Sequence, residues 1–183
     1  QMAKGHSYFH SSSVEVSPDN RYGLFAIDTV GRRIYEFLIK DLTTGDLLPD
    51  RITGVTGNAE WATDSQTIFY SRQDPETLRA DRIFRHTLGS MPDNDFLVYE
   101  EKDETFSCHL EKTKSDKFLV IHCESTLTNE ARILHSDQPD GEFKVFEPRL
   151  RKHEYQIDHI GDRFYILSNL NARNFKLMSA SET

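Results

Sequence analysis

Eight histidines are the residues of this chain whose type most readily suggests metal-binding or acid–base chemistry. His153 and His159 would lie on one face of a predicted strand, but about 20 Å apart, which is too far for both to bind one metal ion. His109 and His122 fall on neighbouring predicted strands and can approach each other, yet two ligands do not define a specific site. We therefore predict core or hydrogen-bonded histidines, and we expect neither a metal ion nor another cofactor.

The two cysteines, Cys108 and Cys123, lie on either side of a predicted turn at Asp116. Pairing of strands around that turn would place Cys108 opposite residue 121 or 122, and not opposite Cys123. This spacing favours two buried thiols in a reducing compartment, which we expect to be the cytoplasm. A diagonal disulfide is the alternative.

Motifs that carry enzymatic chemistry are not found in the sequence. It contains no Gly-x-Ser-x-Gly nucleophile elbow, no phosphate-binding glycine loop, no Cys-x-x-Cys pair and no His-Glu-x-x-His. Its nine glycines are dispersed as turn residues. We therefore predict no catalytic residue within these 183 positions.

The composition argues against two classes of partner. The formal net charge is −8 and the lysines and arginines form no basic stripe, so we expect no binding to nucleic acid. No apolar run approaches the roughly 20 residues of a membrane-spanning helix, and the N-terminus lacks the apolar centre of a secretory signal. We expect no membrane partner.

A short polar turn that contains an aspartate and leads into an apolar strand occurs four times. The aspartates are Asp19, Asp64, Asp116 and Asp162, which are separated by 45, 52 and 46 residues. A period near 45 residues that contains only strands is typical of β-propeller blades, each of which is a four-stranded antiparallel sheet.

The strand that follows each turn is almost continuously apolar, which predicts burial on both of its faces, as between stacked blades. We expect an all-β partial propeller of about four consecutive blades, near residues 11–57, 58–102, 103–150 and 151–183, after a lead-in at 1–10. Residues 75–79 are the one segment expected to form a turn of helix. The predicted strands are 13–16, 22–28, 34–41, 47–52, 59–62, 67–72, 82–88, 96–101, 106–112, 118–123, 132–135, 142–147, 155–159, 163–168 and 174–179.

The fourth predicted blade lacks its outer strand, so residues 174–179 would expose unpaired backbone groups. Blades at both ends would also expose apolar faces. We therefore expect the chain to be part of a longer protein and, by itself, to self-associate through blade edges or faces.

Several segments resemble oligopeptidase B, also called protease II, a branch of the prolyl oligopeptidase family. They are residues 71–89, 99–106 and 158–165, together with His153, Glu154 and Tyr155 just before the last of them. The resemblance extends from about Gly5 to Met178, which is nearly the whole chain.

The resemblance implies a serine peptidase with two parts. In this family a C-terminal α/β-hydrolase domain carries a Ser-Asp-His triad, and an N-terminal seven-bladed propeller restricts entry to short peptides. Enzymes of this branch cleave after Arg and Lys. The chain matches only the first half of the propeller, so the triad belongs to a domain outside it, and the chain itself would be a gating portion without catalytic residues.

We predict that residues on the inner strands and their entry loops line the tunnel or face the hydrolase domain. For each of these residues, a role in blade packing or turn capping is the alternative. Trp61 in particular is expected to be a core residue. The alternative function is a stand-alone propeller scaffold for protein interaction, closed by dimerisation. The candidate residues are Glu60, Trp61, Arg72, Asp74, Glu76, Arg79, Asp103, Glu104, Thr105, Phe106, His153, Glu154 and Tyr155.

Overall fold

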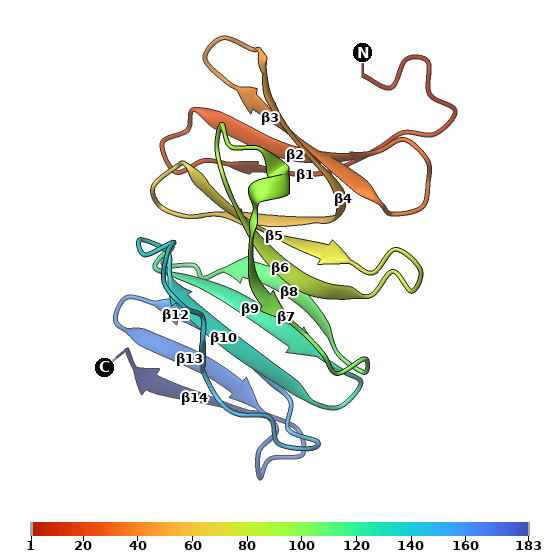
Figure 1. Ribbon diagram of the computed structural model, residues 1–183. Coiled ribbons are helices and arrows are strands. Elements are labelled where there is room, and N and C mark those ends of the chain that lie inside the picture. The colour runs from red at the N-terminus through yellow and green to blue at the C-terminus, as the bar shows by residue number, and fades with distance from the viewer. Residues whose placement is uncertain (1, 183) are drawn as a thin grey trace. The chain divides into compact units, whose positions relative to one another are not determined.

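The chain divides into two compact units, unit 1 (Gln1–Glu100) and unit 2 (Glu101–Thr183), of which the computed structural model describes residues 2–182. Both units consist of antiparallel strands (Figure 1). Within the described residues the only helix is a short 3-10 turn, η1 (Pro92–Asn94), and no helix is long and apolar enough to cross a membrane. The prediction of an all-β chain is confirmed.

Unit 1 is one seven-stranded sheet in which each strand pairs with the next along the chain. Such a meander needs only short connections, because antiparallel neighbours can be joined by tight turns. The strands are β1 (His10–Val16), β2 (Tyr22–Asp28), β3 (Tyr35–Asp41), β4 (Leu47–Trp61), β5 (Thr67–Gln73), β6 (Ala80–Thr87) and β7 (Phe96–Glu100).

Strand β4 joins the two halves of this sheet. Its first part pairs with β3 and its last part with β5, with a change of register between Val55 and Ala59. The sequence predicted two separate strands here, and that prediction is wrong. Gly54 and Gly57 have positive φ angles of 72° and 89°, so the chain bends at these glycines without leaving the sheet. At Gly57 a Cβ atom would lie 3.3 Å from the ring of Tyr35, so a side chain would also be crowded there.

The core of unit 1 is built around Trp61, which is 1% exposed. Its indole stacks on the ring of Tyr22, with centroids 6.4 Å apart, and its Nε1–H donates to the carbonyl of Glu15 at 3.1 Å. The partner for the indole N–H allows a large aromatic side chain to be buried without an unsatisfied donor. The other members of this cluster are Leu24, Ala26, Phe37, Ile39, Ile52, Val55, Ala59, Ile68 and Tyr70.

Unit 2 contains two separate sheets. The first has the order β11-β10-β9-β8 and the second the order β12-β13-β14. Their strands are β8 (Ser107–Lys112), β9 (Phe118–Glu124), β10 (Asn129–His135), β11 (Lys144–Val145), β12 (Tyr155–Ile160), β13 (Arg163–Ser168) and β14 (Lys176–Ser181).

The two sheets of unit 2 pack through one apolar layer. Val120 and Ala131 from the first sheet form a cluster with Tyr155 and Ile157 from the second. Beside them the ring of Phe118 lies 4.9 Å from that of Phe164. Burial of these side chains holds the two sheets together face to face.

Three of the four recurring turns have the same backbone hydrogen bond, but their aspartates are not at equivalent positions. The N–H of Ser17, Ala62 and Thr113 each donates to the carbonyl five residues later. The third residue after each of these donors has a left-handed backbone conformation, and it is Asn20, Ser65 or Asp116. Asp19 and Asp64 come one position earlier, so Asp116 does not correspond to them. The fourth turn is shorter, with two residues between Ile160 and Arg163, and begins with Gly161 at φ 68°.

The ladder between β8 and β9 also differs from the predicted register. Cys108 lies directly opposite Cys123, and His109 directly opposite His122. The predicted pairing of Cys108 with residue 121 or 122 is therefore wrong. The loop closed by Thr113 and Phe118 is centred between Ser115 and Asp116, and that centre places residue 108 opposite residue 123.

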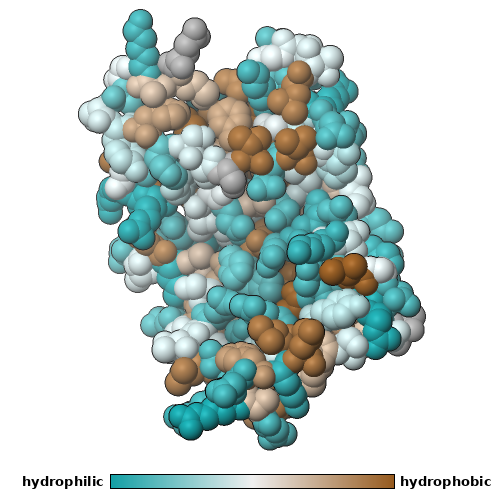
Figure 2. All heavy atoms as spheres, turned by 180° about the vertical axis from the view of Figure 1, so that it is seen from behind, coloured by the Kyte–Doolittle hydropathy of each residue, from teal (hydrophilic) through white to brown (hydrophobic). Residues whose placement is uncertain are grey.

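The apolar strand after each turn is buried on both faces in β2, β5 and β9. In β13 the pattern alternates, because Phe164 is buried while Tyr165 and Leu167 are exposed. The prediction of two buried faces is therefore wrong for β13. Figure 2 shows that hydrophobic residues also reach the surface among the hydrophilic ones.

The predicted helical turn at residues 75–79 is not formed. The segment connects β5 and β6, and the N–H of Asp74 donates to the carbonyl of Arg79 at 2.8 Å. The Asp74 carboxylate also accepts from the N–H groups of Glu76 and Thr77, at 3.0 and 2.7 Å. An aspartate that satisfies its own turn in this way favours a compact hairpin loop over a helix.

Candidate functional site

Four of the predicted interface residues of unit 1 lie on the β5–β6 hairpin and its loop, namely Arg72, Asp74, Glu76 and Arg79. Arg72 lies with its guanidinium 4.8 Å from the ring centroid of Phe84, a cation–π contact. Glu76 is exposed, and Arg79 forms an ion pair with Asp81 at 3.6 Å. On β4, Glu60 is half-buried and Trp61 belongs to the core, as its residue type favoured.

The predicted residues before β8 form an exposed turn over a buried aromatic ring. Asp103 accepts hydrogen bonds from the backbone N–H and the hydroxyl of Thr105, at 2.9 and 2.7 Å, while Glu104 points to solvent. Phe106 is buried, with the guanidinium of Arg149 3.9 Å from its ring centroid. Only the turn is therefore available to a partner.

The predicted residues at the start of β12 are largely internal. His153 is buried with Nε2 2.8 Å from the hydroxyl of Ser168, and the amide nitrogen of Asn169 donates to the carboxylate of Glu154 at 3.1 Å. The hydroxyl of Tyr155 donates to the carbonyl of Glu147 at 3.0 Å, and burial raises the pKa of this tyrosine to about 12. These residues hold the sheet in place.

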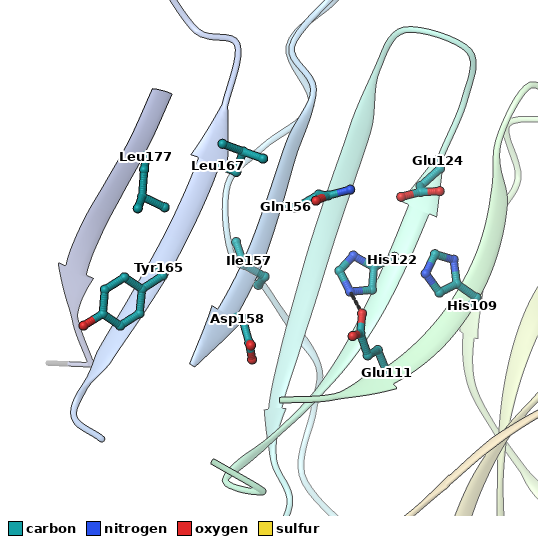
Figure 3. A pocket seen from close by; sticks show the side chains of 10 residues that line it. All are labelled: His109, Glu111, His122, Glu124, Gln156, Ile157, Asp158, Tyr165, Leu167 and Leu177. Atoms are coloured by element: carbon teal, nitrogen blue, oxygen red, sulfur yellow. Dashed lines mark ion pairs between the residues drawn. The ribbon is translucent and has the colours of Figure 1, made fainter. Parts of the chain in front are cut away.

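A groove in unit 2, with a volume of about 420 Å³, was not predicted from the sequence. Figure 3 shows that its residues come from both sheets of the unit. The lining residues are His109, Glu111, His122, Glu124, Gln156, Ile157, Asp158, Tyr165, Leu167 and Leu177.

Three side chains of this groove converge. The rings of His109 and His122 are stacked, with centroids 4.9 Å apart and an interplanar angle of 15°. Nε2 of His122 lies 3.3 Å from Oε2 of Glu111, the contact drawn as a dashed line in Figure 3. One potential ligand atom from each of the three residues lies within 4.8 Å of the other two.

The environment of this cluster changes how its groups ionise. Burial lowers the pKa of His109, and the nearby His122 lowers it further, so the neutral imidazole is favoured. The pKa of Glu111 is also lowered, chiefly by its hydrogen-bonding interaction with His122, so the carboxylate is favoured. Neutral imidazole and carboxylate are the forms of these side chains that bind metal ions.

The sequence held part of the signal for this cluster. His109 and Glu111 are two residues apart, so they share one face of β8. The observed register then adds His122 from β9. With the register predicted for Cys108, His122 would not lie directly opposite His109, and Glu111 was not among the predicted site residues.

A second group of potential ligands lies on the other face of β8. Cys108 and Cys123 are both buried and are not joined by a disulfide, with their sulfur atoms 3.3 Å apart, so the prediction of two buried thiols is confirmed. The contact with Cys123 raises the pKa of Cys108, and burial raises it further. The neighbouring Glu101 is buried and forms an ion pair with Arg149.

Comparison with known proteins gives consistent results. The family described as "Prolyl oligopeptidase, N-terminal beta-propeller domain" matches residues 1–182. Dipeptidyl aminopeptidase BI of Pseudoxanthomonas mexicana is 43% identical over 180 residues, which are 98% of this chain and 25% of that protein. Protease 2 of Moraxella lacunata is 32% identical over 180 residues, 97% of this chain and 26% of that protein.

A solved structure agrees with these sequence matches. Oligopeptidase B from Leishmania major superposes on this chain with a TM-score of 0.92 and 26% sequence identity. The match covers 99% of this chain and 26% of the Leishmania chain. The chain thus spans about a quarter of the length of the relatives it matches. The predicted partial propeller and the predicted resemblance are confirmed, and the chain belongs to the prolyl oligopeptidase family, as part of its N-terminal β-propeller domain.

Proposed function

We propose that this chain is part of a propeller that restricts access to the active site of a serine oligopeptidase. The observation that carries the proposal is the family match over residues 1–182, combined with relatives that are named as peptidases and are about four times as long. In this proposal the catalytic triad lies in an α/β-hydrolase domain, which is the main partner of the chain.

The physical task of such a propeller is exclusion. Peptide hydrolysis requires a preorganised site from which bulk water is removed. A rigid wall of sheets around the site admits short, flexible peptides and rejects folded proteins on size alone. Opening would be a movement between the propeller and the hydrolase domain, as in other lid-gated enzymes.

Short peptides with Arg or Lys before the scissile bond are the proposed substrates, by analogy with the oligopeptidase B branch. The relative at 43% identity carries a different name, dipeptidyl aminopeptidase, which favours a second candidate activity, the removal of dipeptides from a free N-terminus. An Arg substrate with a blocked N-terminus distinguishes the two, because only the first activity cleaves it.

Among the predicted interface residues, we propose the exposed turns as the surfaces that meet the partner domain or the substrate. These are the β5–β6 loop at residues 74–79 and the turn at residues 103–105. We propose blades near residues 11–57, 58–102, 103–150 and 151–183. We also propose a reducing location such as the cytoplasm, which two cysteines without a disulfide between them favour.

A charge reversal at the exposed turn tests the gating role. In the full-length protein, Glu104→Lys should change the rate with long basic peptides more than the rate with a basic dipeptide, because only the long peptide is sensitive to the entry path. Asp93→Lys, which reverses another exposed acid in η1, is the matched control. Equal effects of Glu104→Lys on both substrates would reject gating.

A second experiment locates the chemistry. The 183-residue chain and the full-length protein are treated with a serine-directed phosphonate and an Arg-based chromogenic dipeptide. The proposal expects labelling and turnover only in the full-length protein. Labelling of the isolated chain would contradict it, and a reading frame that stops after Thr183 would favour a stand-alone scaffold.

A further inference from the structure

We propose that His109, Glu111 and His122 form a binding site for one divalent transition-metal ion of the Zn²⁺ class. The site is independent of the gating role, since its three residues differ from the exposed turns assigned to that role.

Strand geometry explains why three ligands meet here. His109 and Glu111 project from the same face of β8, and His122 is the directly paired residue on β9. Paired residues of an antiparallel ladder have Cβ atoms about 5 Å apart, and next-but-one residues on a strand are separated by about 7 Å. Long side chains such as His and Glu cover these separations, and the backbone that carries them is held by the β8–β9 ladder.

The observed distances suit a tetrahedral ion. With metal–ligand bonds of about 2.0–2.1 Å, two ligand atoms of a tetrahedral site lie about 3.3 Å apart. Nε2 of His122 and Oε2 of Glu111 are separated by 3.3 Å. A ring nitrogen of His109 lies within 4.8 Å of these two atoms. A small rotation of the His109 side chain would bring that nitrogen to bonding distance of the same ion.

An unsatisfied polar atom points to a missing ligand. His122 is 5% exposed, and its Nε2 is buried without a hydrogen bond of acceptable geometry to any described residue, despite the contact with Glu111. Leaving such an atom unsatisfied costs about 1–3 kcal/mol. A metal ion at the focus of the cluster would satisfy it.

The fourth coordination position opens onto the groove. Asp158 lines the groove, but its Oδ1 already accepts from the N–H groups of Lys114 and His159, at 2.9 and 2.8 Å. The fourth ligand is therefore a water molecule or another exchangeable group, as in zinc sites that keep an open position. The acidic side chains of Asp158 and Glu124 favour entry of a cation.

The donor set selects the class of metal. Two imidazoles and one carboxylate suit Zn²⁺ and its neighbours Co²⁺, Ni²⁺ and Cu²⁺, whereas Ca²⁺ and Mg²⁺ prefer oxygen ligands alone. The group of Cys108, Cys123 and Glu101 is a weaker candidate, because its carboxylate is already paired with Arg149 and all three residues are buried away from an entry path.

Titration of the tag-free, metal-depleted chain with Co²⁺ tests the site, because Co²⁺ bound by nitrogen and oxygen ligands gives visible absorption that Zn²⁺ then abolishes. We expect saturation at one equivalent. Glu111→Gln and His109→Gln should weaken binding by about 100-fold or more, since even the loss of an outer-shell partner costs 10- to 100-fold. The Glu111 side chain is 65% exposed, so its variant keeps the fold, which circular dichroism verifies.

Matched controls remove a histidine or a glutamate elsewhere on the surface. His10→Gln and Glu142→Gln change exposed residues of the same types and should bind Co²⁺ as the wild-type chain does. Two results would overturn the site: no saturable binding of Co²⁺ or Zn²⁺ by the wild-type chain, or equal binding by the wild-type chain and by both ligand variants.

Discussion

Two buried histidines, His86 in unit 1 and His122 in unit 2, have opposite surroundings. Nδ1 of His86 lies 2.7 Å from Asp95 and its Nε2 lies 3.0 Å from Asp50, so both ring nitrogens have carboxylate partners. Asp95 also accepts from the hydroxyl of Tyr70 at 2.7 Å. Nε2 of His122, in contrast, has only the exposed carboxylate of Glu111, 3.3 Å away, and forms no hydrogen bond of acceptable geometry with a described residue.

The number of partners of the ring nitrogens distinguishes a histidine that stabilises the fold from one that is available to bind a ligand. A fully satisfied buried network specifies one arrangement of the core, and it leaves no coordination for a ligand. A buried donor or acceptor without a partner is unfavourable by itself, unless something outside the chain completes it. Burial alone therefore does not identify a functional histidine, and the count of its partners is more informative.

The largest expected effect is the loss of His86. His86→Leu leaves the carboxylates of Asp50 and Asp95 buried without their partner, which should lower the free energy of unfolding by about 3–5 kcal/mol. Urea denaturation followed by circular dichroism measures it, with the exposed His10→Leu as control. A loss below about 1 kcal/mol would mean that the two carboxylates find other partners.

The pH dependence should also distinguish the two regions. Burial favours a lower pKa for His86, but the hydrogen bonds to Asp95 and Asp50 outweigh it, so the pKa is raised above the ordinary value of 6.5. Its contribution to stability is then complete below about pH 6.5 and is lost as the pH rises through the folded pKa. Each unit of difference in pKa corresponds to about 1.4 kcal/mol.

For His109 the sign is reversed. Its pKa is lowered from 6.5, so its contribution is complete above about pH 6.5 and is lost as the pH falls through the folded pKa. Unfolding of wild type, His86→Leu and His109→Gln at about pH 5 and about pH 8 measures both dependences. The same slope for both variants would contradict the assigned surroundings.

A smaller effect is expected at His122. His122→Leu removes a buried nitrogen whose one charged partner, the carboxylate of Glu111, is exposed, so it should change the free energy of unfolding by only about 1 kcal/mol, or raise it. The exposed Glu111 remains solvated after the change. The same urea measurement applies, without added metal. A loss as large as that of His86→Leu would show that His122 has a structural partner.

The smallest effect on stability is expected at the apolar side of the groove. Leu177 is 71% exposed on β14, so Leu177→Lys should alter stability by about 0.5 kcal/mol or less. It should nevertheless reduce self-association of the 183-residue chain in light scattering at high concentration, because β14 is the last strand of its sheet and its side chains are available for contact. Unchanged scattering would assign association to another surface.

The architecture followed from the sequence because its signals are local. The strands at Tyr22–Asp28 and Arg163–Ser168 were predicted at their observed limits, since an apolar run between polar turns defines both ends. The continuity of β4 was not predictable from such signals. Pro49 lies where the register with β3 shifts, and a bulge tolerates a residue without an N–H donor.

The identification of the three candidate metal ligands required the register between β8 and β9, which local sequence patterns do not determine. The aspartates of the turns are not equivalent, because Asp116 is itself the left-handed residue, a position that Asn20 and Ser65 hold in the first two turns. A displacement of one residue moves side chains to the other face of a sheet. The sequence therefore allows His109 and Glu111 to be placed on one face of a strand, while the position of His122 directly opposite His109 follows only from the observed register.

The continuous strand β4 makes unit 1 a single cooperative structure. Because one backbone segment carries the hydrogen bonds of both halves of the sheet, neither half can open without disturbing the other. The sheets of unit 2 share no such strand and are joined by the loop between β11 and β12. Amide hydrogen exchange should therefore proceed uniformly across β2 to β6, but in two separate stages across β8–β10 and β12–β14.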